Sequence, residues 1–237
     1  MRDEQILRLE EMDSRHWWTT TRLHLIYSSL SRLQLKMPII FEIGAGSGGT
    51  LGFLKSQGCE VLALEPTEYG AAACRKLGIE TINSTFENSI EWPNQVGCVL
   101  LLDVLEHIEN DNLALESIYQ KAKIGTFLVI SVPADPKLWS KLDTDVLHFR
   151  RYTIKSLTQT VSSSGWDIVS MRYWMSLLKP LVQFRRSIMK GDFASETKMP
   201  NLIVNMILKI VVGFESKIPY LGRIPGTTIF LIAQKSK

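Results

Sequence analysis

The residues best suited to chemistry lie in two short clusters, and each cluster contains a histidine. The first is the segment Asp103-Val-Leu-Glu106-His107, and the second contains His148. A histidine can act as a general base because its proton affinity lies near neutral pH. The same acids and imidazoles are also ligands for a divalent cation. We therefore predict His107 and His148 as catalytic residues. A helix-packing role for His107 is the alternative.

A glycine-rich segment at residues 38–50 predicts a cofactor site. An apolar run ends there in Glu42, glycines follow, and an apolar-periodic helix begins. This strand, tight turn and helix start let backbone N–H groups approach a cofactor closely, although a purely structural turn is possible. The glycines fit both a dinucleotide pattern and the pattern G-x-G-x-G. A carboxylate at Glu42 would repel a pyrophosphate but suits the cationic head of S-adenosylmethionine.

Two further apolar runs end in acids. Residues 60–65 end in Glu65, and residues 96–103 end in Asp103. In an open parallel sheet, ligands bind at the carboxyl ends of the strands, where an acid can hydrogen-bond both ribose hydroxyls. The loop with His148 follows the fifth predicted strand, so it should lie over the same edge.

The hydrophobic periodicity predicts an alternation of strands and helices after a helical start at 3–12 and 19–35. Such alternation indicates a parallel sheet with helices on both faces. Further strands are predicted near 166–173 and 227–233, with a long insertion between them. The main strands are expected near 38–43, 60–65, 79–83, 97–103 and 125–132, and the helices near 49–57, 67–77, 111–123 and 153–164.

As a set, the segment EIGAGSG, the acid at Glu65 and the segment DVLEH resemble class I S-adenosylmethionine-dependent methyltransferases over about residues 36–170. The resemblance implies a Rossmann-like α/β fold with seven strands, mostly parallel, the last inserted antiparallel beside the fifth. We expect one domain, with a helical lid at 1–36, a core at 37–173 and 223–237, and a helical cap at 174–222. The implied cofactor-binding residues are Trp18, Arg22, Glu42, Gly44, Ala45, Gly46, Gly48, Glu65, Pro66, Thr85, Phe86, Asp103, Val104 and Leu105.

The start His-Trp-Trp…Arg and the loop His-x-Arg-Arg-Tyr resemble bacterial methyltransferases of small-molecule and surface-polysaccharide pathways. This likeness implies that Trp18 stacks over the site and that Arg22 meets the methionine carboxylate, a pairing that suits a guanidinium. The chain departs from the family pattern after the third strand, where Thr85 replaces the acid that often binds adenine. Adenine recognition would then use the Phe86 backbone N–H and apolar stacking.

A metal site is a second implication of the resemblance. Asp103, Glu106, His107 and His148 look like the cation-binding signature of small-RNA terminal methyltransferases, which has two carboxylates and two histidines. A divalent cation held there could activate a hydroxyl. The first acid is Asp rather than Glu, which shortens its reach. The basic residues are dispersed without an aromatic platform, so we expect no nucleic acid partner.

Composition indicates an ordinary globular chain. It has 237 residues, 22% of them charged, and a formal net charge of +3. Such a small net charge does not indicate a large nucleic-acid-binding surface. The three cysteines form no C-x-x-C pair, and the N-terminus does not resemble a secretory signal, so we expect a cytoplasmic location. Segment 174–222 is apolar with basic flanks. It predicts a folded cap, while a dimer surface or a peripheral membrane helix are alternatives.

We predict S-adenosylmethionine-dependent methyl transfer to a hydroxyl, or to an amine, of a small molecule or glycan. An NAD-dependent oxidoreductase is the first alternative, disfavoured by Glu42 and by the absence of a second catalytic domain. A non-catalytic cofactor-binding regulatory protein is the second alternative, and the two histidines argue against it.

We expect S-adenosylmethionine or its demethylated product to bind with micromolar affinity, a free energy of about −8 kcal/mol. NAD should bind far more weakly because carboxylates stand at Glu42 and Glu65. Glu65→Ala should weaken cofactor binding by about 1.5–3 kcal/mol, since it removes charge-assisted hydrogen bonds. Isothermal titration calorimetry measures all three quantities. Tight NAD binding without S-adenosylmethionine binding would contradict the assignment.

Overall fold

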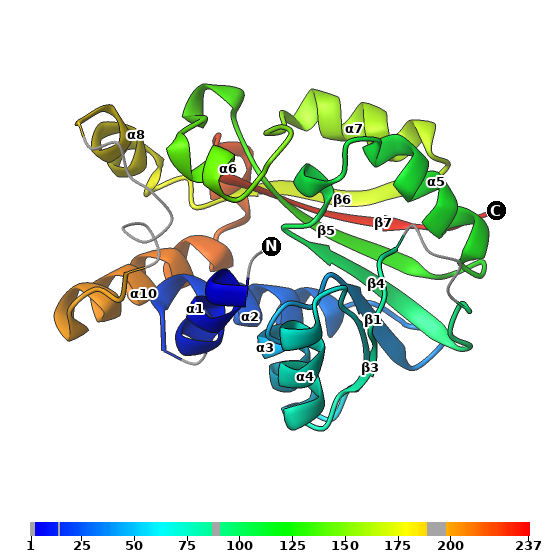
Figure 1. The fold of residues 1–237 in the computed structure, drawn as a ribbon. Coiled ribbons are helices and arrows are strands. Elements are labelled where there is room, and N and C mark those ends of the chain that lie inside the picture. Colours follow the sequence, from blue (N-terminus) through cyan, green and yellow to red (C-terminus); the bar gives the residue numbers. More distant parts are fainter. Residues whose placement is uncertain (1–2, 14, 87–90, 189–197) are drawn as a thin grey trace.

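A twisted seven-stranded sheet forms the centre of the computed structural model, which describes residues 3–13, 15–86, 91–188 and 198–237 (Figure 1). The strand order is β3-β2-β1-β4-β5-β7-β6, with β7 antiparallel to both of its neighbours and the other pairs parallel. The predicted sheet is therefore confirmed, including the last strand beside the fifth. The strands are β1 (Ile39–Ile43), β2 (Glu60–Leu64), β3 (Glu80–Ile82), β4 (Val96–Leu102), β5 (Phe127–Pro133), β6 (Asp167–Trp174) and β7 (Thr228–Gln234).

The helices lie close to their predicted positions, with two exceptions. The second helix ends at Leu30 rather than at residue 35, because residues 31–37 form the turn that leads into β1. A short helix at Lys141–Asp145 was not predicted. The α-helices are α1 (Asp3–Asp13), α2 (Trp17–Leu30), α3 (Gly49–Ser56), α4 (Glu68–Lys76), α5 (Asp111–Lys121), α6 (Lys141–Asp145), α7 (Ile154–Ser163), α8 (Lys179–Ile188) and α10 (Leu202–Lys217), and the 3-10 helices are η1 (Leu105–His107), η2 (Pro136–Leu138) and η3 (Pro219–Arg223).

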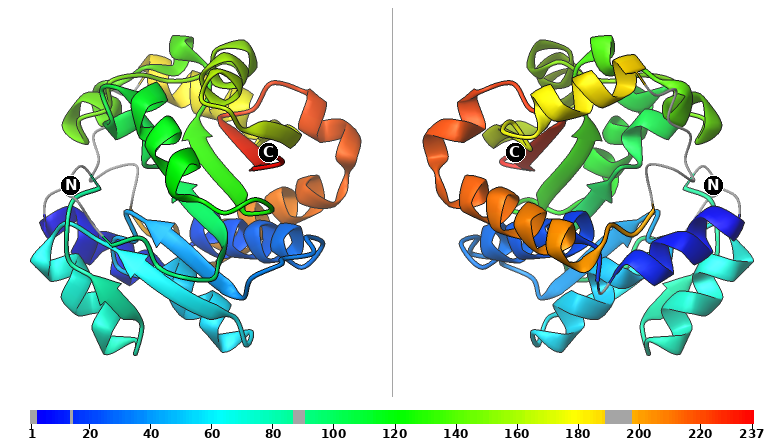
Figure 2. Two further views of the ribbon diagram at one scale, coloured as in Figure 1. Left: turned by 90° about the vertical axis from the view of Figure 1, so that its right-hand side faces the viewer. Right: turned by 90° about the vertical axis from the view of Figure 1, so that its left-hand side faces the viewer.

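Helices cover both faces of the sheet (Figure 2). Each face carries its own apolar core. On one face, Leu115 of α5 and Leu157 of α7 are fully buried against the strands. On the other face, Ile26 of α2, Leu54 of α3 and Val212 of α10 are fully buried. The strands are apolar on both sides because both faces are covered. Among the described residues, none of the helices combines the length and apolarity that crossing a bilayer requires.

Helices outside the predicted core at 37–173 and 223–237 also pack against the sheet. The second half of α2 packs Leu25, Ile26 and Leu30 into the core, so only its first two turns remain for the predicted lid at 1–36. Helix α10 packs along α2. The segment 174–222, predicted as a cap, contains α8, α10 and most of η3. Its residues 189–197 lie outside the described residues.

A buried carboxylate fixes α10 to the end of β6. Glu215 is fully buried and accepts hydrogen bonds from the backbone N–H groups of Ser176 (2.8 Å) and Leu177 (3.1 Å). These two N–H groups have left the sheet ladder and need an acceptor. Arg172 donates to the Ser216 carbonyl at 3.2 Å, which adds a second tie between the same elements.

We expect Glu215→Ala to lower the free energy of unfolding by about 2–4 kcal/mol, because two buried N–H groups lose their acceptor. Glu215→Gln should lose less, since its carbonyl oxygen can still accept one of the bonds. Glu68→Ala, at an exposed site, is the control. Urea denaturation followed by circular dichroism gives the three values. Equal stability of the alanine and wild-type proteins would refute the role given to Glu215.

Candidate active site

A cavity of about 360 Å³ lies over the carboxyl ends of β1 and β4. Its walls include the start of α2, the glycine turn after β1, η1, the loop around α6, and α8. This is the edge of a parallel sheet at which ligands bind, because the strand order reverses between β1 and β4. The sequence-predicted clusters around Asp103 and His148 both reach this cavity.

The glycine turn has the backbone that only glycine adopts easily. Gly44, Gly46 and Gly48 have φ angles of +76°, +57° and +79°. A Cβ atom on Gly44 would lie 2.7 Å from the Val104 side chain, and one on Gly48 would lie 2.9 Å from Cys74 Sγ. A Cβ atom on Gly46 would meet nothing within 4 Å, so this glycine borders open space. Gly44 and Gly48 therefore permit packing, and Gly46 leaves room for a ligand.

Glu65 holds this turn from behind. Its carboxylate accepts hydrogen bonds from the Gly46 N–H (2.8 Å), the Thr67 N–H (2.9 Å) and the Thr67 hydroxyl (2.6 Å). Glu65 is buried and does not line the cavity. Its predicted contact with the ribose stays a prediction. The structure adds a second role, because Glu65→Ala would also release the glycine turn.

Asp103 connects three elements at the edge of the sheet. Its carboxylate pairs with Arg22 of α2 and accepts a hydrogen bond from the Ser131 hydroxyl of β5 at 3.1 Å. The Arg22 guanidinium carbon lies 4.3 Å from the centre of the Trp18 ring, in cation–π geometry. Only the Nη1 atom of Arg22 pairs with Asp103, and its buried Nε atom has no hydrogen-bond partner among the described residues. The predicted contact of Arg22 with the methionine carboxylate therefore stays a prediction.

Glu106, His107 and His148 form a compact cluster. Their candidate ligand atoms all lie within 4.8 Å of one another, and the two imidazole rings meet edge to face at 4.6 Å. Glu106 is fully buried, and neither of its carboxylate oxygens has a hydrogen-bond partner. The Nε2 atom of His148 lies 3.8 Å from Glu106 Oε1. Asp103, the fourth predicted metal ligand, lies outside this cluster.

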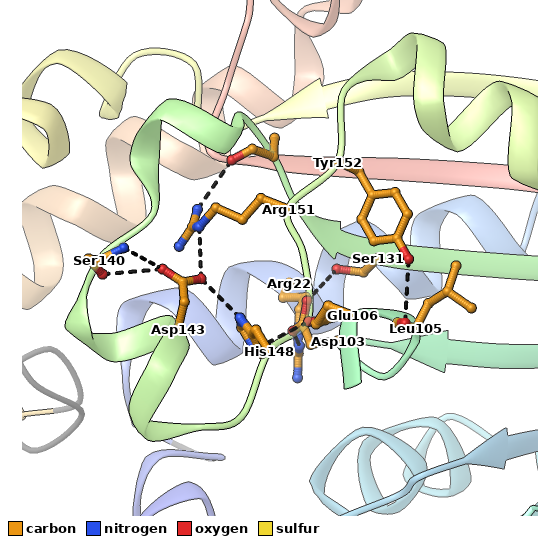
Figure 3. A network of polar contacts seen from close by, with 11 residues as sticks. Arg22, Asp103, Leu105, Glu106, Ser131, Ser140, Asp143, His148, Arg151 and Tyr152 are labelled. Carbon is orange, nitrogen blue, oxygen red and sulfur yellow. Dashed lines mark hydrogen bonds and ion pairs between the residues drawn. The ribbon is translucent and has the colours of Figure 1, made fainter. Parts of the chain in front are cut away.

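His148 is held from its other side by Asp143 of α6 (Figure 3). The Asp143 Oδ1 atom lies 2.9 Å from His148 Nδ1 and 2.8 Å from Arg151 Nε. The other oxygen accepts from the Ser140 N–H at 2.8 Å, and Arg151 also donates to the Ala134 carbonyl. His148 therefore stands between a fully paired buried carboxylate and an unpaired one.

The two carboxylates have opposite protonation preferences. Although burial opposes it, hydrogen bonding from His148 and the Arg151 charge hold the pKa of Asp143 far below its usual range. Burial, with the charge of Asp103, raises the pKa of Glu106 well above its usual value. Burial and the neighbouring His148 lower the pKa of His107 to about 4. At neutral pH the site thus holds an anionic Asp143 and a neutral His107, while the environment of Glu106 favours its protonated form.

Not all predicted site residues reach the cavity. Ten of them line it, and seven, including the two that follow β3, do not. The predicted residues that line the cavity are Trp18, Arg22, Glu42, Gly44, Ala45, Gly46, Asp103, Glu106, His107 and His148. The predicted residues outside the lining are Gly48, Glu65, Pro66, Thr85, Phe86, Val104 and Leu105.

Sequence reasoning missed several residues at the site. Asp143 and Arg151 are buried around His148, and Arg185 and Arg186 of α8 line the cavity. A signal for Asp143 existed in the segment Ser140-Lys-Leu-Asp143, because Ser followed by an acid three residues later marks a helix start. That signal indicates a cap and does not show that the acid is buried beside a histidine.

The sequence matches a family model described as a methyltransferase domain over residues 20–171. This span is more than half of the chain, so the chain belongs to this methyltransferase family. It is a class I S-adenosylmethionine-dependent methyltransferase by family and fold. The nicotinamide-dependent alternative has no support from these comparisons. No curated protein matches the sequence.

Solved structures with the same fold are distant in sequence. A chain of the complex between the Haloferax volcanii Trm112 methyltransferase activator and a methyltransferase is 14% identical, with TM-score 0.66, over 99% of this chain and 96% of that one. A SAM-dependent methyltransferase of Archaeoglobus fulgidus is 18% identical, with TM-score 0.57, over 90% and 94%. Phosphoethanolamine N-methyltransferase 2 of Haemonchus contortus, solved with S-adenosyl-L-methionine, is 17% identical, with TM-score 0.65, over 100% and 58%.

The lowered pKa of His107 predicts a pH-dependent stability. Between about pH 4 and pH 6.5 the unfolded chain binds a proton at this position and the folded chain does not, so stability rises with pH across this window. Because of this difference in proton binding at His107, we expect the free energy of unfolding to fall by about 1–2 kcal/mol when the pH is lowered from 7 to 5. His107→Gln should therefore flatten the pH profile of urea unfolding measured with chelator present. His24→Gln, at an exposed site, is the matched control, and an unchanged slope in His107→Gln would refute the assignment.

Proposed function

We propose that this protein transfers a methyl group from S-adenosylmethionine to a hydroxyl, or less favourably to an amine, of a small molecule or glycan. The observation that carries the proposal is the Asp143–His148 pair, which faces Glu106 and His107 within the cavity of the glycine turn. The donor supplies a carbon already activated by its sulfonium, so the protein must align the acceptor and remove its proton.

His148 is the residue best placed to take that proton. Asp143 is anionic and lies 2.9 Å from Nδ1, which favours the tautomer with its proton on Nδ1. Nε2 is then a proton acceptor that faces the cavity. This is the base-and-orienter arrangement of general-base catalysis. His107 has a pKa of about 4, so it is neutral at physiological pH and suits hydrogen bonding to the acceptor better than proton removal.

In a second version of this proposal, a divalent cation assists the deprotonation of the acceptor hydroxyl. The candidate ligand atoms of Glu106, His107 and His148 all lie within 4.8 Å of one another, and a cation would supply positive charge to the unpartnered buried oxygens of Glu106. A cation bound there would bring the acceptor hydroxyl close to neutral-pH deprotonation. It would compete with a proton on Glu106, whose raised pKa favours the protonated form, so its affinity would rise with pH. Asp103, the predicted fourth ligand, pairs with Arg22 and lies outside the cluster of the other three.

The cavity lining supports an acceptor that carries a negative group. Arg185 and Arg186 of α8 line the cavity together with Arg151. Guanidinium groups recognise carboxylates and phosphates through paired hydrogen bonds. Such groups are common on the small molecules and glycans of the bacterial pathways that the sequence resembles. None of the three cysteines, all of which are described, is in a disulfide, which suits the reducing cytoplasm as the place of action.

We expect His148→Ala to lower methyl transfer about 10²–10⁴-fold with unchanged affinity for S-adenosylmethionine, because a general base acts on the chemical step. The assay follows label from methyl-labelled S-adenosylmethionine into a bacterial extract of polar metabolites and glycans. Calorimetry gives the cofactor affinity. His24→Ala, an exposed histidine outside the cavity, is the control. Wild-type turnover in His148→Ala would refute the proposal, and no transfer by the wild-type protein would favour a non-catalytic role.

Chelation, metal addition and the variant Glu106→Gln distinguish the metal-free base from the cation-bound site. With a cation, chelation abolishes transfer, Mg²⁺ or Mn²⁺ restores it, and Glu106→Gln loses Mn²⁺ binding as measured by electron paramagnetic resonance. With a metal-free base, chelation changes nothing and Mn²⁺ does not bind.

A further inference from the structure

The exposed side of α10 is an apolar stripe. Its five members recur every three or four residues, so they lie on one face of the helix. Their exposed fractions run from 50% to 66%, which is unusual for side chains of this size. The stripe residues are Ile203, Met206, Ile207, Ile210 and Phe214.

The opposite face of α10 is the one that holds the helix in the fold. Asn205 accepts a hydrogen bond from the Trp17 N–H at 2.8 Å and donates to the Arg15 carbonyl at 2.9 Å. Val212 and Glu215 are fully buried on the same side. The inner face therefore includes polar anchors while the outer face is almost entirely apolar. A helix in water has the reverse pattern, and an apolar patch of this kind marks an interaction surface.

In the described segments that carry and flank α10 in the chain, the exposed charges have one sign. Over the described residues 177–188 and 198–226, the single acid is Glu215, and it is buried. Helix α8 lies at the same end of the molecule as α10 (Figure 2, right) and exposes Leu181 and Phe184. The exposed cations of these segments are Arg185, Lys198, Lys217 and Arg223.

We propose that the stripe on α10, with its surrounding cations, binds the surface of an anionic lipid bilayer. The apolar side chains would enter the boundary between headgroups and acyl chains, and the cations would lie at the lipid phosphates. The helix lies on the membrane and does not span it. A second copy of this chain fits less well, because a self-complementary contact would place cations against cations.

Vesicle co-sedimentation of the full chain tests this proposal. One set of vesicles contains phosphatidylcholine with about one third phosphatidylglycerol, and the other contains phosphatidylcholine alone. We expect binding to the anionic vesicles that weakens as salt rises from about 0.1 M to about 1 M. The double variant Ile210→Asp/Phe214→Asp should lower the partition coefficient more than about tenfold.

The control is Leu113→Asp/Ile124→Asp. It makes the same chemical change at two side chains that are each 61% exposed and lie outside the stripe, compared with 63% for Ile210 and 60% for Phe214. We expect this control to bind anionic vesicles like the wild-type protein, and thermal melting verifies that both variants fold. Binding retained by the stripe variant would overturn the proposal, and so would no wild-type binding. A dimer in analytical ultracentrifugation that the stripe variant abolishes would assign the stripe to a second copy and would also overturn it.

Discussion

The carboxylate of Asp143 is fully buried and is met by donors from three residues of its own loop. His148 and Arg151 approach one oxygen, and the Ser140 N–H approaches the other. The His148 N–H also bonds to the Asp143 carbonyl at 2.8 Å, so backbone and side chain fix the same pair. A buried anion persists only where such partners surround it. The position of His148 over the cavity, and with it the geometry of the site, depends on this contact.

Glu106 stands on the other side of His148 in the opposite condition. It is fully buried without a hydrogen-bond partner, which costs free energy in a folded protein. Protonation relieves part of that cost, and a cation would relieve it further. Strain of this kind gathers at functional sites, because the surrounding structure can hold it in place. One imidazole thus lies between a hydrogen-bonded acid and an acid without a hydrogen-bond partner. This arrangement makes the cluster suitable for proton transfer or cation binding.

Local patterns predicted the parts of this molecule that depend on local rules. Alternating apolar runs predicted the sheet, and the glycines predicted the turn, because Gly44 and Gly46 have backbone angles that other residues rarely adopt. The pairing of Arg22 with Asp103 could not be predicted, since 81 positions separate the two residues. Asp143 was missed because its helix is only five residues long and its burial depends on tertiary packing. The helical cap predicted at 174–222 contains α8, α10 and most of η3, and its packing along α2 depends on tertiary contacts that no local pattern specifies.

The contact between α10 and α2 connects the outer surface of the molecule with the wall of the cavity. Its first turns carry Trp18 and Arg22, which line the cavity, and its backbone at Trp17 bonds to Asn205 of α10. Helix α10 therefore presents an apolar face outward and steadies the cavity wall with its inner face. An occupant of the outer face would dock close to the helix that carries Arg22, the residue predicted to meet the methionine carboxylate. Docking and ligand binding thus act on one helix.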